Sequence, residues 1–143
     1  MVVLAYDHRG YDLMQKIKPY LSSKEIEFIE FASVEYDKAD SYSQFAKQAN
    51  DYILENPESK GIYSCRSGVG IAIAANRRKG IRAGLGYNEK LTFLARNDDN
   101  INVLVLPSEA VDIQLAKKLI KIFLTTDFEG GRHISRLKQL DED

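Results

Sequence analysis

The sequence is poor in cysteine and lacks long apolar runs, the features that would indicate disulfide bonds, a membrane span or secretion. It contains one cysteine, Cys65, among 143 residues, so an intramolecular disulfide is excluded. It has no apolar run close to the roughly 18 residues that a membrane span requires. Its first residues, MVVLAYDH, lack the basic start and the long apolar stretch of a signal peptide. These absences predict a cytoplasmic protein with no membrane partner.

The chain also has almost no net charge, because 20 basic residues face 21 acidic ones and leave a formal charge of −1. Such a balance gives no overall attraction to nucleic acid, so we expect no nucleic-acid partner and expect any anion to be held by a local cluster. The chain has only three prolines and is 44% hydrophobic, which is typical of a globular protein. Its length predicts a single domain over residues 1–143.

What the sequence does contain is a regular alternation of short Val/Ile/Leu-rich runs with longer segments of helical period. The runs predict strands at residues 2–6, 27–31, 61–64, 81–85 and 103–106. The periodic segments predict helices at 11–21, 42–54, 71–78, 89–96, 110–124 and 131–140, with Pro19 able to kink the first helix or end it early. This order predicts an α/β fold with a parallel sheet covered on both faces. Ligands bind such sheets at the carboxyl ends of the strands, which here precede residues 7–10, 65–70 and 87–88.

The segment from Ser64 to Ile71, SCRSGVGI, is the most informative candidate site. Gly68 and Gly70 lie just before a predicted helix, where backbone N–H groups can turn toward an anion. A cysteine at such a helix start would have its thiolate favoured by the helix dipole. A thiolate facing converging N–H groups is what enolisation beside a carbonyl requires. The alternative is that Cys65 is a small buried residue and that the glycines only make a tight turn, since a short Gly-x-Gly is a weak signal.

Asp7 and His8 directly follow the first predicted strand. An acid and an imidazole at this place can polarise sugar hydroxyls or hold a phosphate. The alternative is an aspartate that caps the next helix beside a surface histidine.

A small basic cluster follows Gly130 and Gly131 near the end of the chain. Arg132 and Arg136 are four residues apart and would share a helix face, which suits the bidentate binding of a phosphate. The alternative is a solvated basic face. His8 and His133 are far apart in the sequence and no Cys/His ligand spacing is present, so no metal site is predicted.

Together, these segments resemble the family of ribose-5-phosphate isomerase B and the galactose-6-phosphate isomerase subunits, nearly from end to end. Residues 7–10 look like the family's Asp-His-x-Gly, and Tyr42 with Phe45-Ala46 looks like its Asp-Tyr-Pro-x-Phe/Tyr-Ala segment. Residues 65–70, 73–77 and 80–83 resemble Cys-Gly-Thr-Gly-Ile-Gly, Ile-Ala-Ala-Asn-Lys and Gly-Ile-Arg-Ala, and residues 102–104 and 128–133 complete the set.

The resemblance implies a Rossmann-like three-layer sandwich with a five-stranded parallel sheet. It also implies a homodimer or a dimer of dimers in which each active site is built from both subunits. The implied reaction is aldose–ketose isomerisation of a phosphorylated sugar through a cis-enediolate, without a metal or an organic cofactor. The default substrate is D-ribose 5-phosphate, which would be converted to D-ribulose 5-phosphate.

The resemblance also assigns roles to individual residues. Cys65 matches the family's base, and Ser67 and the N–H groups of the loop match the part that stabilises the enediolate. Asp7 matches a group that contacts sugar hydroxyls, and Tyr42 a tyrosine that lines the pocket. The loop residues that supply N–H groups are Arg66, Gly68, Val69 and Gly70, and the phosphate-binding set, partly from the partner chain, is His8, Arg132 and Arg136.

The sequence departs from the family pattern at several of these positions. Asp98 replaces the ring-opening histidine, and Asp99 replaces the asparagine that follows it. Asp98 could act as the ring-opening acid only if its pKa were raised. Glu109 stands where the family pocket has an arginine and would repel a phosphate if it faced the site, whereas Arg66 replaces a glycine and would offset the lost arginine. Ser41 and Ser43 replace the residues on either side of Tyr42.

Three hypotheses therefore remain open. The chain is an isomerase of ribose 5-phosphate, an isomerase of a hexose 6-phosphate such as allose or galactose 6-phosphate, or a sugar-phosphate-binding homologue without turnover. Cys65 argues for an enzyme, because a protein that only binds does not need a thiolate base.

Overall fold

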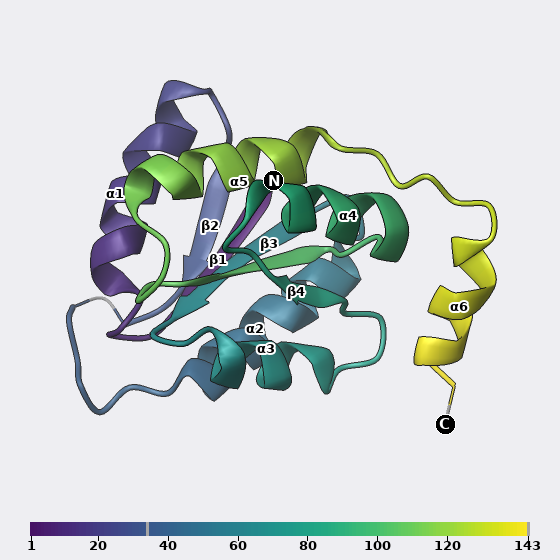
Figure 1. Ribbon diagram of the computed structural model, residues 1–143. Coiled ribbons are helices and arrows are strands. Elements are labelled where there is room, and N and C mark those ends of the chain that lie inside the picture. The colour runs from purple at the N-terminus through teal and green to yellow at the C-terminus, as the bar shows by residue number, and fades with distance from the viewer. Residues whose placement is uncertain (34, 143) are drawn as a thin grey trace.

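The chain folds into one parallel sheet with helices on both faces (Figure 1), and the computed structural model describes residues 1–33 and 35–142. The strands are β1 (Val2–Tyr6), β2 (Phe28–Phe31), β3 (Lys60–Cys65), β4 (Ala83–Leu85) and β5 (Val103–Pro107). The helices are α1 (Tyr11–Ser23), α2 (Tyr42–Glu55), α3 (Val69–Asn76), α4 (Glu89–Asp99), α5 (Ile113–Thr125) and α6 (His133–Leu140). The predicted three-layer α/β sandwich is confirmed.

The five strands pair in the order β2-β1-β3-β5-β4, and all four pairings are parallel. The predicted five-stranded parallel sheet is therefore confirmed. From β1 the chain adds β2 on one side and later adds β3 on the other side. The loops that leave β1 and β3 consequently lie at the point where the strand order reverses, which is where sheets of this kind bind ligands.

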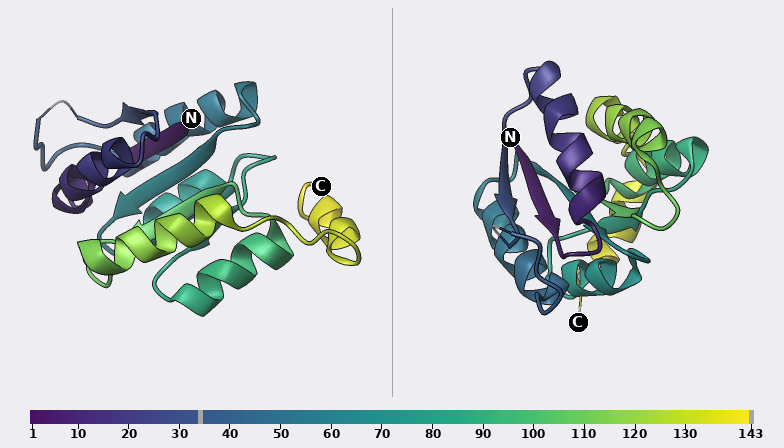
Figure 2. Two further views of the ribbon diagram at one scale, coloured as in Figure 1. Left: turned by 90° about the horizontal axis from the view of Figure 1, so that it is seen from above. Right: turned by 90° about the vertical axis from the view of Figure 1, so that its left-hand side faces the viewer.

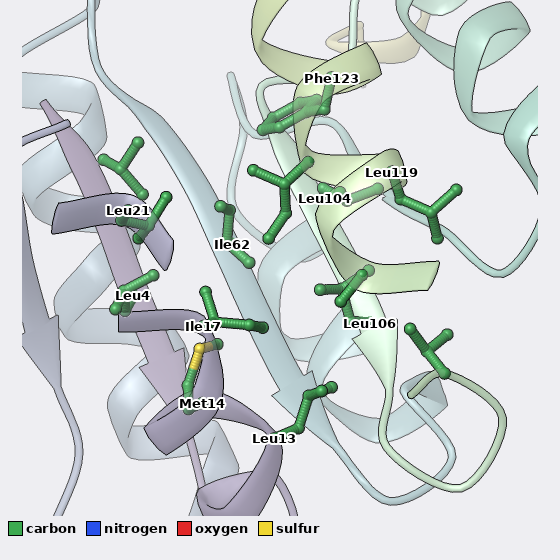
Figure 3. Close-up of a cluster of buried hydrophobic side chains, with 14 of the residues drawn as sticks. Leu4, Leu13, Met14, Ile17, Leu21, Ile62, Leu104, Leu106, Leu119 and Phe123 are labelled. Carbon is green, nitrogen blue, oxygen red and sulfur yellow. The ribbon is translucent and has the colours of Figure 1, made fainter. Parts of the chain in front are cut away.

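Each face of the sheet carries its own apolar core, because successive side chains of a strand point to opposite faces. One face packs against α1 and α5, and Figure 3 shows the side chains that meet there: Leu4, Ile62, Leu104 and Leu106 from strands, and Met14, Ile17, Leu21, Leu119 and Phe123 from helices. The other face packs against α2 and α3 through the strand residues Val3, Ala5, Tyr63, Cys65 and Val105. The thiol of Cys65 thus belongs to the α2–α3 side. Figure 2 shows the layers from two further directions.

All six helices differ from their predicted bounds by one to three residues at one end or both, and the differences in α1 and α3 involve Pro19 and the loop before Val69. Helix α1 continues through Pro19 to Ser23, so of the two effects considered for this proline, a kink or an early end, the early end does not occur. Ile17 and Leu21 are both fully buried, and their burial keeps the last turn in place although the proline ring removes one backbone donor. Helix α3 begins at Val69 rather than at residue 71, directly after Gly68 in the left-handed region.

Helix α6 lies apart from the sheet, beside α4, at the end of an extended stretch that leaves α5 (Figures 1 and 2). This arrangement leaves most of its surface exposed, including Arg132 just before it and Arg136 within it. Within residues 1–33 and 35–142, no helix combines the length and the apolar character needed to cross a bilayer.

Candidate active site

The loops that follow β1 and β3 touch each other at the carboxyl edge of the sheet. A Cβ added to Gly10 would lie 2.7 Å from the carbonyl oxygen of Ser64, so the first loop packs directly on the end of β3. The charge of Asp7 also acts on the thiol of Cys65. The structure thus brings the segments 7–10 and 65–70 into one place.

Cys65 is the last residue of β3 rather than the first residue of the loop, and it is only 5% exposed. Burial raises the pKa of its thiol above the usual value, and the negative charge of Asp7 acts in the same direction. The backbone N–H groups of Ile71, Gly68 and Gly70 favour the thiolate and offset only part of this effect. The helix start thus favours the thiolate, but the loss of solvent outweighs the amides, so the pKa of the thiol is raised overall. The thiol is nevertheless bordered by amides and a carboxylate, as a base beside an anion site would be.

The loop between β3 and α3 has a backbone shape that requires glycine. Gly68 has a φ of +77°, and a Cβ there would lie 2.7 Å from Cδ2 of Leu85. The hydroxyl of Ser67 accepts a hydrogen bond from the N–H of Val69 at 3.2 Å. Because α3 begins at Val69, the next N–H groups, of Gly70 and Ile71, are first-turn donors that the helix itself leaves free. They are placed to bind an anion near Cys65.

Tyr42 covers the same loop from the start of α2. A Cβ added to Gly70 would lie 2.7 Å from Cζ of Tyr42 and 2.9 Å from its hydroxyl oxygen. The tyrosine is 39% exposed, so one side of its ring packs on the loop while the other side remains open. Tyr42 therefore forms a wall of the candidate site.

The carboxylate of Asp7 has a local structural role. Its Oδ1 accepts hydrogen bonds from the N–H groups of Arg9 at 2.9 Å and Gly10 at 3.2 Å, which shapes the turn into α1. The helix-capping alternative raised by the sequence is not observed, because the N-cap of α1 is Gly10, which has no side-chain cap hydrogen bond, and Asp7 bonds only to the turn before the helix. Asp7 is also close enough to Cys65 to raise the pKa of its thiol.

His8 is held by a residue that the sequence analysis missed. Its Nδ1 lies 3.0 Å from Oδ1 of Asp40, the same oxygen accepts the His8 N–H at 3.1 Å, and its ring packs edge-on against Tyr36. Asp40 comes one residue before Ser41, which stands where the family has its aspartate, and this displaced acid was the available signal. Asp7, His8 and Asp40 offer ligand atoms close enough for a metal ion, but Asp7 Oδ1 and His8 Nδ1 already have these partners.

Arg66 and Glu109, the two departures near the loop, form an ion pair. Nε of Arg66 lies 3.2 Å from Oε2 of Glu109, and both side chains are exposed. The loops that carry them are joined by the bonds from Ser108 N–H to the Cys65 carbonyl and from Glu109 N–H to the Arg66 carbonyl. Arg66 therefore neutralises the negative charge of Glu109, which would otherwise repel a bound phosphate.

The remaining predicted site residues lie at the opposite edge of the sheet. Asp98 and Asp99 are in the last turn of α4, which runs back toward the start of β5, whereas Cys65 lies beside the end of β5. A five-residue strand places these two edges roughly 15 Å apart. Asp99 lines a cavity of about 560 Å³ with Arg82 and Asp141, and Arg132 and Arg136 lie on the separate α6 segment. One chain by itself does not bring these four residues to Cys65.

Asp98 has close neighbours of its own. Asn97 Nδ2 donates to Oδ1 of Asp98 at 2.9 Å, and Nε2 of His133 lies 3.7 Å from that oxygen. Asp98, Glu129 and His133 form a second group of potential metal ligands.

Comparison with known proteins gives a consistent result over the whole chain. Residues 2–140 match the family model described as Ribose/Galactose Isomerase. A ribose 5-phosphate isomerase from Thermotoga maritima is 39% identical and superposes with a TM-score of 0.95, covering 99% of this chain and 97% of that one. The ribose-5-phosphate isomerase B of Mycoplasma genitalium, solved with bound ribulose-5-phosphate, is 36% identical with a TM-score of 0.92, covering 97% and 92%. A Mycoplasma pneumoniae protein named "Probable ribose-5-phosphate isomerase B" is 36% identical over 139 residues, 97% of this chain and 91% of its own.

The family motifs predicted from the sequence thus agree with the fold and with the full-length matches. The chain belongs to the ribose/galactose isomerase family of sugar-phosphate isomerases.

Proposed function

We propose that the chain interconverts D-ribose 5-phosphate and D-ribulose 5-phosphate, with Cys65 as the base. The observation that carries this proposal is the thiol of Cys65 at the strand-order reversal, beside the free N–H groups at the start of α3. The relative from Mycoplasma genitalium, which binds ribulose-5-phosphate, supports the choice of a pentose phosphate.

The reaction moves one proton along the sugar. In the open-chain aldose the Cys65 thiolate removes the proton from C2, and the electron pair moves to the carbonyl oxygen on C1. The N–H groups of the loop from Arg66 to Gly70, with the Ser67 hydroxyl, stabilise the negative oxygen of the cis-enediolate. The thiol then returns the proton to C1 as the proton on the C2 hydroxyl passes to the C1 oxygen, which gives the 2-ketose. No atom is gained or lost.

Other residues bind the sugar and open its ring. Asp7 contacts the sugar hydroxyls, Tyr42 lines the pocket, and His8 is oriented toward the phosphate by Asp40. Asp98 is the acid that opens the ring, with Asp99 beside it. Arg132 and Arg136 bind the phosphate.

We propose that the active unit is a homodimer whose sites are shared. The separation of Asp98, Arg132 and Arg136 from Cys65 within one chain supports this arrangement, because a second copy would supply the missing group. The outer face of α3 and edge strand β4 also exposes the apolar residues Val69, Ile73 and Leu85, which line a shallow depression of about 310 Å³. Such a patch is typical of a protein interface.

A coupled assay with ribose 5-phosphate, allose 6-phosphate and galactose 6-phosphate tests the reaction and the substrate together. We expect turnover of the pentose phosphate and its loss in Cys65→Ala. Preference for a hexose 6-phosphate would support the second hypothesis, and binding of sugar phosphates without any turnover would support a binding protein. Turnover that Cys65→Ala leaves unchanged would contradict the mechanism.

Mixing two inactive variants tests the shared site. Cys65→Ala and Arg136→Ala dimers, unfolded together and refolded in equal amounts, would form heterodimers with one intact site each. About a quarter of the wild-type activity should return if each site uses both subunits, because half of the randomly mixed dimers are heterodimers. If each site lay within one chain, no activity would return.

A further inference from the structure

The end of α4 and the start of α6 bring together three side chains whose residue types bind metal ions. They are Asp98, in the last turn of α4, Glu129, before the glycine pair, and His133, the first residue of α6. One ligand atom from each lies within 4.8 Å of the other two. Nε2 of His133 is 3.4 Å from Oε2 of Glu129 and 3.7 Å from Oδ1 of Asp98.

The imidazole of His133 is the unusual member of this group. Its side chain is 7% exposed, and Nε2 is buried without a hydrogen-bond partner among the described residues. A buried polar atom that lacks a partner costs about 1–3 kcal/mol. Nε2 nevertheless points between two carboxylates, each of which is partly open to solvent. A cation between the three atoms would satisfy all of them.

The distances suit a small tetrahedral ion. Zinc binds imidazole nitrogen and carboxylate oxygen at about 2.0–2.2 Å, so two of its tetrahedral ligands lie roughly 3.3–3.6 Å apart. The two distances from Nε2, 3.4 and 3.7 Å, lie close to this range. A mixture of imidazole and carboxylate favours zinc and similar transition ions over Mg²⁺ and Ca²⁺, which prefer oxygen ligands alone.

Asn97 orients the two carboxylates from outside the group. Its side-chain N–H₂ donates to Oδ1 of Asp98 at 2.9 Å and to Oε2 of Glu129 at 3.0 Å. The main-chain carbonyl of Asn97 also accepts a hydrogen bond from the N–H of Glu129 at 3.0 Å, which fixes the approach of the chain to α4. Hydrogen bonds of this kind to ligating carboxylates are a regular feature of metal sites.

We propose that Asp98, Glu129 and His133 form a binding site for a divalent transition cation of the zinc type, with water as the fourth ligand. The ion would connect the segment before α6 to the end of α4, and so hold α6 on the body of the protein. A carboxylate that coordinates a cation cannot protonate a sugar, so the bound ion would block the ring-opening role proposed for Asp98, which belongs to the metal-free protein. Binding of the ion is therefore tested without turnover. The sequence spacing of 31 and then four residues between the ligands matches no recognised metal motif, which is why the sequence analysis predicted none.

Cobalt(II) titration of the intact Cys65→Ala protein tests this site, because the visible absorption of Co²⁺ intensifies when the ion enters a tetrahedral protein site. The alanine removes the thiol, which would otherwise bind the ion itself. Asp98→Asn is added to this background as the test variant, and Asp99→Asn, which changes the neighbouring exposed carboxylate, is the matched control. Circular dichroism checks that each variant is folded.

We expect one equivalent of Co²⁺ to bind to Cys65→Ala, to be displaced by Zn²⁺ and not by Mg²⁺, and to be retained by the Asp99→Asn control. Asp98→Asn should weaken binding by at least about tenfold, and Asn97→Ala by about 10–100-fold. At a hundredfold excess over the dissociation constant, Zn²⁺ should raise the melting temperature of Cys65→Ala by roughly 5–10 °C and that of Asp98→Asn by about half as much or less. The absence of tetrahedral Co²⁺ binding, or binding that Asp98→Asn leaves intact, would overturn the proposal. An equal loss in Asp99→Asn would also overturn it, since it would indicate a diffuse acidic surface.

Discussion

The buried thiol of Cys65 predicts a specific dependence of the reaction on pH. Only the thiolate can accept a proton from the sugar, and an ordinary cysteine is only a few per cent thiolate at pH 7. Burial raises the pKa of Cys65 further, so its thiolate fraction at pH 7 is smaller still. We therefore expect log(kcat/KM) for ribose 5-phosphate to rise by about one per pH unit above pH 7, and to level off only beyond the usual cysteine pKa of about 8.5.

Two variants separate this effect from other ionisations. Asp7→Asn removes a negative charge that raises the pKa of the thiol, so the rising limb should move to lower pH even if the maximal rate falls. Cys65→Ala should lower kcat by roughly 100- to 10,000-fold, the usual contribution of a general base. It removes one buried sulfur, which costs only about 1 kcal/mol of folding free energy, so the loss of rate would not come from unfolding.

The same shift links pH to stability. Because the folded-state pKa of the thiol is raised, its contribution to the free energy of unfolding is fully present below the unfolded pKa. This stabilising contribution is lost as the pH rises from about 8.5 through the pKa that the thiol has in the folded protein. Urea denaturation at pH 7 and pH 10 should therefore show a smaller loss of stability in Cys65→Ala than in the wild type.

The assay is steady-state kinetics between about pH 6.5 and 10 at fixed ionic strength. The second ionisation of the substrate phosphate, near pH 6, lies below this window. A rate that is flat between pH 7 and 9, or a limb that does not move in Asp7→Asn, would refute the assignment of the base.

Three further substitutions test the site and the core around it. Gly70→Ala should change the free energy of unfolding by less than about 1 kcal/mol in urea, since the helix gains propensity, while kcat/KM falls because the new Cβ displaces Tyr42; an unchanged kcat/KM would show that the tyrosine does not line the site. Glu109→Gln should cost less than about 1 kcal/mol in thermal unfolding and lower KM at low salt, because it frees its arginine partner for the phosphate. A KM that does not respond would place the ion pair outside the site. Tyr63→Phe should lower the free energy of unfolding in urea by about 1–3 kcal/mol, because its hydroxyl donates to buried Oδ1 of Asn50 at 2.8 Å; a loss below 0.5 kcal/mol would mean that water replaces the bond.

The sequence by itself determined the order of the strands and helices and the family. Strand residues such as Val3 and Leu4 are uniformly apolar because both faces of a parallel sheet are covered, and helical residues such as Ile17 and Leu21 recur at the helical period. These are local patterns, so they can be read without knowing which segments meet. The loop of residues 65–70 was also recognisable, because the positive φ of Gly68 is a requirement of the loop's own backbone.

Only the tertiary structure decided how distant residues combine. It paired His8 with Asp40, joined Arg66 to Glu109, placed Asp98 beside His133, and put Asp98 at the opposite edge of the sheet from Cys65. It also raised the pKa of the thiol overall, because the packing of α2 and α3 removes solvent from Cys65 and this outweighs the helix start, which favours the thiolate. Burial and contacts across the sheet depend on the strand order, which is set by the helical connections between strands. No short segment of the chain contains that information.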